Sequence, residues 1–428
     1  MINQTQSTNT VTTIQPLREK TVSILFAIMT FCAVLPLYFE DTRQVCGLVF
    51  IGLMGYLFTS KRKPLDYQIN EVEWKWMAVS VIYASVFIMS YLMRESYTDD
   101  GSWRIAAPGF ILLLTAWYFL LLRFNAQKNL IVYVSLSSIL AGILLFILEV
   151  SSLDSFDGYR YGAIYSDLGA AGFNVAITSV LLAMLWFQKR RQIFMILIVF
   201  GVVLVGLNGS RTAVLIVLFP IALIGLQYVR NFRGLTRSLK LQLLVGFLTV
   251  FTVLGFFAQD KIFQTFSDIS LITESQYNTS LGQRLVMLDV GSDVALNNFV
   301  LGVGPSEYKN SITEAFKNYD YDSSLKMTII KYTQIHNQYL MDIILSGLFG
   351  LISLLMFVFF PMLYFIRSFN ASPNQTALIG FGFLIGIAFI MLFGAIFTYT
   401  YTTIIYFLAV SAMISSYEKS EFVLNEKK

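Results

Sequence analysis

Charged residues, histidine and cysteine are all scarce in this 428-residue chain. Only 13% of its residues are charged, which is about half the share of a soluble domain. The two cysteines, Cys32 and Cys46, lie within apolar runs, so we expect neither a disulfide framework nor a cysteine-ligated metal site. The net charge of +4 comes from lysines and arginines between the apolar runs and does not indicate a nucleic-acid partner.

Apolar residues are abundant instead, at 56% of the chain, and they recur in runs from one end to the other. Many runs approach the length of about 20 residues that a helix needs to cross a hydrocarbon core about 30 Å thick. Lipid accepts only helices or closed barrels, and a barrel strand shows just about 10 alternating residues. The sequence therefore predicts an all-α polytopic membrane protein. The expected spans, about twelve in number, are 21–39, 44–59, 77–93, 105–122, 130–150, 168–187, 193–208, 211–229, 241–258, 337–366, 376–397 and 399–416.

Lysine and arginine gather in alternate segments between these spans, as in KRK at 61–63. Because basic residues are enriched on the cytoplasmic side, both termini are expected there. The one long connection, 259–336, then lies outside and is long enough to fold as a small lobe. We therefore divide the chain into N-terminal spans at 1–258, the lobe at 259–336, and C-terminal spans with a cytoplasmic tail at 337–428.

A few arginines face the outer side against this bias, close to the only histidine. Arg211 stands in LNGSRTAVL before the eighth expected span, Arg160 in DGYRYG before the sixth, and Arg284 in SLGQRLVML within the long loop. His336 closes that loop. Arginine donates bidentate hydrogen bonds to phosphate oxygens and keeps its charge in a low-dielectric setting. Two or three such side chains can hold a diphosphate without a metal ion.

Each of these signals also has a plain structural interpretation. An outward arginine is often an interfacial residue, and a lone histidine there is often a hydrogen-bonding group. DYD at 320–322 allows a metal-assisted glycosyl transfer, although acidic residues are common in a solvated loop. Tyr399, Tyr401 and Tyr406 suit an aromatic belt at the interface, with sugar stacking as the alternative.

Three residues of the last spans predict packing within the bundle. Asp342 follows His336 inside an apolar run, where a carboxyl group is costly in lipid and should face the bundle interior. Gly382 and Gly386, in GFGFLIG, suit a close approach between helices better than a phosphate-binding loop.

A family resemblance joins the outer residues. HN, then nine residues, then GLFG (His336, Asn337, Gly347 and Gly350) resembles the signature of the O-antigen ligase and O-antigen polymerase superfamily, in which the histidine opens the span after a large periplasmic loop. LNGSRTAVL is similar to that family's arginine segment at the mouth of an earlier span, and LGQRLVMLDVG to its loop segment. The resemblance covers roughly residues 155–366.

The resemblance implies a GT-C-type membrane glycosyltransferase of the bacterial inner membrane, with its active site facing the periplasm. It implies that an O-antigen carried on undecaprenyl diphosphate is transferred to a sugar hydroxyl of lipid A–core in lipopolysaccharide biosynthesis. Direct displacement predicts inversion at the anomeric carbon, and because arginines replace the usual divalent ion, we expect neither a metal nor a cofactor. Catalytic roles are expected for His336, Arg211 and Arg284, and donor-diphosphate binding for Arg211, Arg284, Arg160 and Asn337. His336 is the expected general base; its alternative role is to bind the diphosphate as a cation.

Two other functions remain as alternatives to the ligase. A polymerase of the same superfamily would extend lipid-linked repeats, and a glycolipid transporter would also have many spans. Transporters tend to show repeated halves and ionisable residues near the bilayer midplane, whereas this chain has a long loop only in its second half.

The chain departs from the family signature after His336. Many superfamily members are expected to carry an acidic residue where this chain has Met341, with Asp342 next to it, so no catalytic role is assigned to Asp342.

Overall fold

The computed structural model describes residues 71–93, 107–116, 130–153, 159–164, 168–230, 263–332 and 334–425, together with isolated positions between 241 and 255. All regular secondary structure within these residues is helical. The expected spans 21–39 and 44–59 lie outside the described residues, as does most of 241–258.

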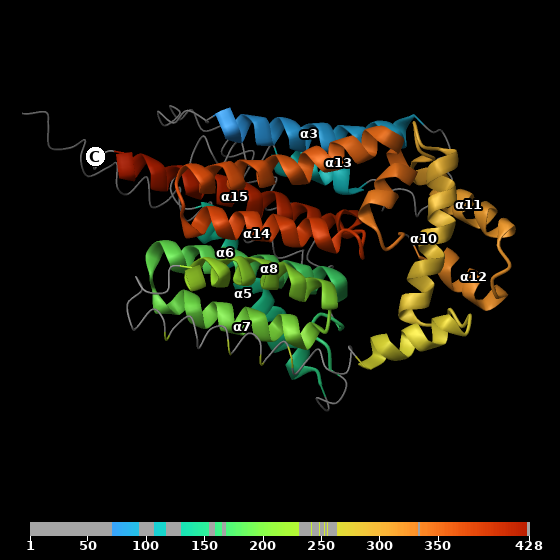
Figure 1. The fold of residues 1–428 in the computed structure, drawn as a ribbon, viewed down its shortest axis with the longest axis horizontal. Helices are drawn as coiled ribbons and strands as arrows, with labels where there is room; N and C mark the ends of the chain where they lie inside the picture. Colours follow the sequence, from blue (N-terminus) through green and yellow to red (C-terminus); the bar gives the residue numbers. More distant parts are fainter. Residues whose placement is uncertain are drawn as a thin grey trace, which may run out of the picture.

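The helices of the expected spans lie side by side in a bundle (Figure 1). They are α3 (Glu71–Leu92), α5 (Leu130–Ser151), α6 (Leu168–Lys189), α7 (Gln192–Asn208), α8 (Arg211–Arg230), α13 (Gln338–Ala371), α14 (Gln375–Ile390) and α15 (Thr400–Asn425). By length and composition, α3, α5, α6 and α13 can each cross a membrane. This confirms the helical membrane class, while the number of about twelve spans and the GT-C-type architecture stay predictions.

The long loop folds into helices at one end of the bundle (Figure 1). A helix at 263–273 is followed by α10 (Ser280–Asn297), α11 (Gly304–Ala315) and α12 (Ser323–Ile330). Helix α10 crosses the direction of the bundle helices, and α11 and α12 lie on its far side from the bundle. The side chain of Thr279 caps α10 by accepting a hydrogen bond from the Gly282 backbone N–H. We refer to residues 263–332 as the lobe.

Small residues allow α14 to approach α8 closely. A Cβ added at Gly382 would lie 2.8 Å from the Cα of Pro220, and one at Gly386 would lie 3.3 Å from the Cα of Ile216. The predicted packing role of both glycines is confirmed. Because the pairs 382–220 and 386–216 run in opposite senses along the chain, the two helices are antiparallel.

Helix α13 is interrupted at Gly347, so the span predicted at 337–366 is not one continuous helix. Gly347 has φ 64° and ψ −149°, a conformation essentially restricted to glycine. A Cβ there would lie 2.2 Å from the carbonyl oxygen of Val300, so the tip of the lobe reaches the interruption. After the interruption, Gly350 lies against the carbonyl of Asp342, because a Cβ on it would be 2.3 Å from that oxygen.

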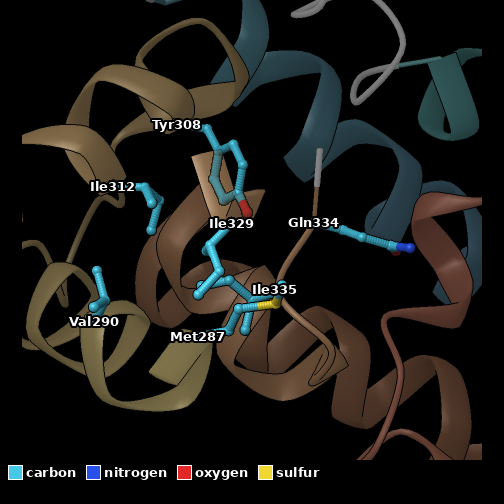
Figure 2. A pocket seen from close by; sticks show the side chains of 7 residues that line it. All are labelled: Met287, Val290, Tyr308, Ile312, Ile329, Gln334 and Ile335. Atoms are coloured by element: carbon cyan, nitrogen blue, oxygen red, sulfur yellow. The ribbon is translucent and has the colours of Figure 1, made fainter. Parts of the chain in front are cut away.

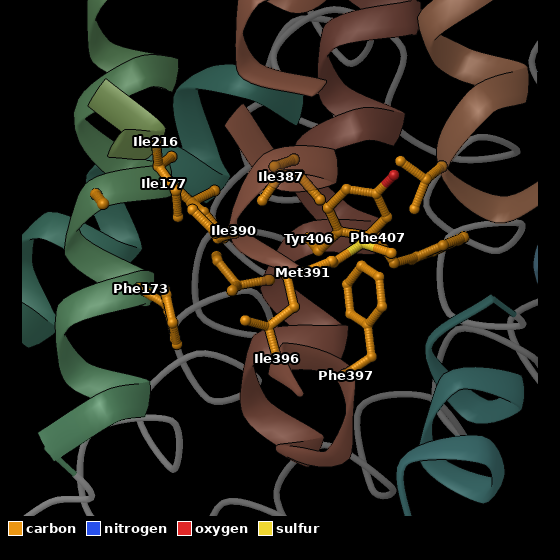
Figure 3. Close-up of a cluster of buried hydrophobic side chains, with 14 of the residues drawn as sticks. Phe173, Ile177, Ile216, Ile387, Ile390, Met391, Ile396, Phe397, Tyr406 and Phe407 are labelled. Atoms are coloured by element: carbon orange, nitrogen blue, oxygen red, sulfur yellow. The ribbon is translucent and has the colours of Figure 1, made fainter. Parts of the chain in front are cut away.

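The core of the bundle contains two of the residues singled out in the sequence. Asp342 is fully buried and accepts hydrogen bonds from the Gln338 amide at 2.6 Å and the Tyr83 hydroxyl at 3.1 Å, which confirms its inward orientation. Tyr406 is also fully buried and donates to the carbonyl of Phe357, so its assignment to an interfacial belt is wrong. It belongs to a cluster of buried side chains between the helices (Figure 3).

Candidate functional site

The chain around His336 is held to the bundle by two glutamines that flank it, Gln334 before α13 and Gln338 at its first position. Gln334 accepts a hydrogen bond from the Thr398 hydroxyl and donates to the Tyr399 hydroxyl at 2.6 Å. The side-chain oxygen of Gln338 accepts from the backbone N–H of Phe397 at 2.7 Å, and its amide donates to Asp342. The polypeptide on either side of His336 is therefore tied to the segment after α14.

The residue next to His336 is held by the lobe. Ile335 lines a small pocket together with Met287 and Val290 of α10 and Tyr308 of α11 (Figure 2). Gly291 leaves the room for it, because a Cβ at that position would lie 2.2 Å from the Cδ1 atom of Ile335. Since neighbouring residues bind to the lobe and to the bundle, the position of His336 depends on how these two parts are joined.

The His336 ring lies at this junction in a partly buried setting. Tyr332 meets it edge-on, with ring centroids 5.9 Å apart. Burial of the ring and, to a lesser extent, the charge of Arg284 lower the pKa of His336 from its ordinary 6.5 to about 4. The imidazole is therefore neutral at neutral pH. Among the described residues no side chain forms a hydrogen bond with the ring.

Arg160 lies in the connection between α5 and α6, and its side chain contacts the turn that joins α7 to α8. Its Nε donates to the carbonyl of Asn208 at 3.0 Å. The loop also pairs with α7, because the Tyr161 backbone N–H donates to the carbonyl of Leu207 at 3.2 Å and the Asn208 amide donates back to the Tyr161 carbonyl at 2.8 Å. Gly209 ends α7 with φ 68°, and a Cβ there would lie 3.4 Å from the Nε of Arg160. Partial burial lowers the pKa of Arg160 below its usual range.

A buried carboxylate at the end of α5 holds this loop in place. Glu149 is fully buried and accepts hydrogen bonds from the Tyr159 hydroxyl and the Gly162 backbone N–H, each at 2.8 Å, and from the Ile164 backbone N–H at 2.9 Å. Three donors to one carboxylate compensate for its desolvation. Glu149 thereby fixes the loop on both sides of Arg160.

The antiparallel contact between α8 and α14 shows how the α7–α8 turn, contacted by Arg160, is placed relative to the segment around His336. Extending the register of Ile216 with Gly386 places Arg211, at the start of α8, level with Met391 at the end of α14. The carbonyl of Met391 accepts a hydrogen bond at 2.8 Å from the backbone N–H of Gln338, which follows His336 by two residues. The backbone at Arg211 therefore lies at the same end of the bundle as His336. The side chain of Arg211 lies outside the described residues.

The structure places the predicted site residues in two groups, and their joint role stays a prediction. Arg284 and His336 interact electrostatically, whereas Arg160 lies at the α7–α8 turn where Arg211 begins the next helix. Asn337 caps α13, accepting from the Leu340 backbone N–H at 2.9 Å and donating to the Leu392 carbonyl at 3.3 Å. Its expected contact with the donor diphosphate stays a prediction beside this capping role.

Sequence reasoning missed the residues that position the site. Glu149 has a signal that could have been used, because an acidic residue inside an expected span usually has an assigned partner. Gln334 and Gln338 have only a weak signal, since polar residues are common at the start of any span. Among the described residues no group of three or more histidine, cysteine, aspartate or glutamate side chains is arranged to hold a metal ion, and DYD at 320–322 belongs to no such group.

The chain is similar to known proteins over part of its length. Residues 196–355 match a family model described as O-antigen ligase. The match confirms the superfamily resemblance drawn from the sequence; it contains Arg211, Arg284 and His336 and begins after Arg160. An uncharacterized protein of Haemophilus influenzae is 21% identical over 337 residues, which cover 76% of this chain and 80% of that protein.

Proposed function

We propose that this membrane protein, whose residues 196–355 match the O-antigen ligase family, is a glycosyltransferase that uses a glycan carried on undecaprenyl diphosphate. The acceptor is a sugar hydroxyl of lipid A–core, and the reaction takes place at the periplasmic face of the bacterial inner membrane. The observation that carries this proposal is the neutral, partly buried His336 beside the cation of Arg284. Arg160 and Arg211 lie at the same end of the helix bundle.

The arginines serve the leaving group. A polyprenyl donor lies in the bilayer with its diphosphate at the interface, and transfer breaks the bond between the anomeric carbon and a phosphate oxygen. The electron pair of that bond goes to the diphosphate, so negative charge increases there as the reaction proceeds. Arg284, Arg211 and Arg160 stabilise this charge, because fixed cations act most strongly where charge develops in a low-dielectric site.

His336 serves the acceptor. The acceptor hydroxyl oxygen attacks the anomeric carbon from the side opposite the diphosphate, so the anomeric configuration inverts. The hydroxyl proton passes to the imidazole, which has to be neutral to accept it. Burial and Arg284 keep the ring neutral before the donor binds. The negative diphosphate then opposes the effect of Arg284 and raises the pKa of His336, which makes the ring a stronger base in the complex.

Substitutions separate the two roles. His336→Ala removes proton transfer and should lower turnover roughly 10²- to 10⁴-fold while leaving donor affinity nearly unchanged. Arg284→Ala should weaken both donor binding and turnover. The measurements are binding of a lipid-linked donor to the purified variants and the rate of glycan transfer. If His336→Ala loses donor binding as severely as Arg284→Ala, the histidine binds the diphosphate and is not the base.

The polymerase is the second candidate, favoured by the same family match because the superfamily resemblance includes both reactions. Purified protein incubated with two lipid-linked repeats, with and without lipid A–core, separates them. Products that appear only with lipid A–core support the ligase. Longer lipid-linked chains formed without lipid A–core support the polymerase.

The reaction is also proposed to need no metal ion, because arginine takes the part of the divalent cation. Turnover should therefore persist in excess EDTA. Loss of turnover that Mg²⁺ or Mn²⁺ restores would contradict this part of the proposal and return DYD at 320–322 to consideration as a metal site.

A further inference from the structure

The lobe carries an unusually apolar exposed surface for a segment between membrane spans. On α10 the exposed apolar residues are Leu285, Leu288 and Leu296, and the next turn adds Phe299, Val300 and Leu301. Leu296 is 72% exposed, Val300 61% and Leu301 65%. Exposed apolar residues gathered in this way mark a site of interaction with a protein or a membrane. We call these six residues the apolar face of α10.

The spacing of these residues shows that α10 is apolar on two sides. Leu285, Leu288 and Leu296 recur at intervals that bring them to one side of a helix, where they flank the exposed Asp289, whose carboxylate accepts a hydrogen bond from the Tyr321 hydroxyl at 2.9 Å. Val286, Val290 and Val294 are buried on the other side, and α10 packs on α13, α11 and α12. A helix that only covered the lobe core would need the second set alone.

The apolar face of α10 is continuous with the outer wall of the bundle. The carbonyl of Val300 accepts a hydrogen bond from the Leu348 backbone N–H at 3.2 Å, directly after the interruption of α13 at Gly347. The residues that follow on α13 include Phe349, 58% exposed, and Ile352, 47% exposed. Because α13 is apolar and long enough to cross a membrane, these two side chains have hydrocarbon as their natural surroundings.

We propose that the apolar face of α10 lies in the outer leaflet of the bilayer, with Leu296 and the 299–301 turn among the lipid acyl chains. In Figure 1 α10 crosses the bundle direction, so it lies along the membrane surface when the bundle spans the membrane. A helix with one face in the headgroup–acyl boundary is a known mode of membrane contact. The lobe is then seated in the lipid and not suspended in water.

This seating does not depend on the proposed glycosyl transfer, but it bears on it. Arg284 stands one helical turn before Leu288, so immersion of that face holds the guanidinium at the depth of the lipid headgroups. The same contact fixes the lobe against the interruption of α13, and thus the two parts between which His336 is held.

Nitroxide labels at single cysteines test the proposal in nanodiscs made from phosphatidylethanolamine and phosphatidylglycerol. Cys32 and Cys46 are first replaced by alanine, and cysteine is then introduced by Leu296→Cys or Leu301→Cys. Phe349→Cys on α13 is the lipid-facing reference. Thr313→Cys, exposed on α11, is the water-facing reference. Power-saturation EPR measures collisions with oxygen, which concentrates in the bilayer, and with a water-soluble nickel chelate.

We expect both variants to resemble Phe349→Cys, with an oxygen-to-nickel collision ratio several-fold above that of Thr313→Cys. A ratio equal to that of Thr313→Cys would overturn the proposal. Protection from both reagents would also overturn it, because another part of the protein or a second copy would then cover the face. Lipid-like values that appear only after a polyprenyl diphosphate is added would assign the face to the donor instead. Since the labels report immersion and not turnover, these outcomes are independent of the proposed reaction.

Discussion

His336 combines two causes that lower its pKa, and they can be separated because it is the only histidine in the chain. Burial is the larger cause and Arg284 the smaller. Arg284→Gln removes the charge and leaves the burial, so the pKa of His336 should rise above about 4 and stay below its ordinary 6.5. A protein labelled with ¹⁵N and ¹³C at histidine gives a single imidazole signal, whose pH titration by NMR measures this pKa directly.

The matched control is Arg284→Lys, which keeps the positive charge and should leave the pKa lowered. Addition of a diphosphate analogue to the unaltered protein should raise it, because the anion favours the imidazolium. An unchanged pKa in Arg284→Gln would show that Arg284 does not act on the ring, and the proposed pairing of base and cation would be lost.

The guanidinium of Arg284 predicts a second result at the scale of one residue. If it binds the diphosphate through two parallel hydrogen bonds, Arg284→Lys keeps the charge but loses this geometry. Loss of one hydrogen bond to a charged group should weaken donor binding about 10- to 100-fold. Titration of a lipid-linked donor measures the affinity, and Lys309→Arg, on the exposed surface of α11, is the control. Equal donor affinity in Arg284→Lys and the unaltered protein would contradict bidentate binding.

At the scale of the elements, the interruption of α13 predicts a strong effect of a small substitution. Gly347→Ala adds a methyl group 2.2 Å from the Val300 carbonyl oxygen, in a backbone conformation that alanine rarely adopts. The conformational strain alone is on the order of 1–3 kcal/mol, and the clash displaces the lobe from the bundle. We expect a lower thermal unfolding midpoint in detergent and a loss of turnover.

Gly394→Ala is the control for this substitution. The nearest atom to a Cβ at Gly394 is a side-chain carbon of Ile396 at 3.7 Å, an ordinary contact distance. Its unfolding midpoint should therefore stay close to that of the unaltered protein. An unfolding midpoint that falls equally in both variants would show that the effect is general to glycine replacement and unrelated to the interruption of α13.

At the scale of the whole molecule, the distribution of basic residues predicts that the lobe lies on the periplasmic side. In a background without Cys32 and Cys46, Asn318→Cys in the lobe should react with a membrane-impermeant maleimide in intact spheroplasts. Arg62→Cys, in KRK at 61–63, should react only after the membrane is opened. Labelling of Arg62→Cys before the membrane is opened would reverse the predicted orientation and place the proposed site in the cytoplasm.

Much of this protein followed from sequence alone, because the signals concerned are local. Apolar runs predict spanning helices wherever they occur, and the helices α3, α5, α6, α7 and α8 begin and end within a few residues of the expected spans apart from the earlier start of α3. The spacing between His336 and the GLFG motif at 347–350 resembles a family signature, and this spacing can be read from the sequence without a structure. The glycines of GFGFLIG indicated close packing because small residues in a span have few other uses.

The tertiary structure decided what depends on contacts between distant residues. Gln334 pairs with Thr398 and Tyr399, and Glu149 holds the loop of Arg160, through bonds that no local pattern encodes. Gly347 looks like any glycine in an apolar run until the carbonyl of Val300 is found against it. Composition, spacing and charge bias are properties of neighbours in the chain; they determined the helical membrane class and predict the topology. The position of His336 between lobe and bundle is set by packing of segments far apart in sequence, so only the folded molecule shows it.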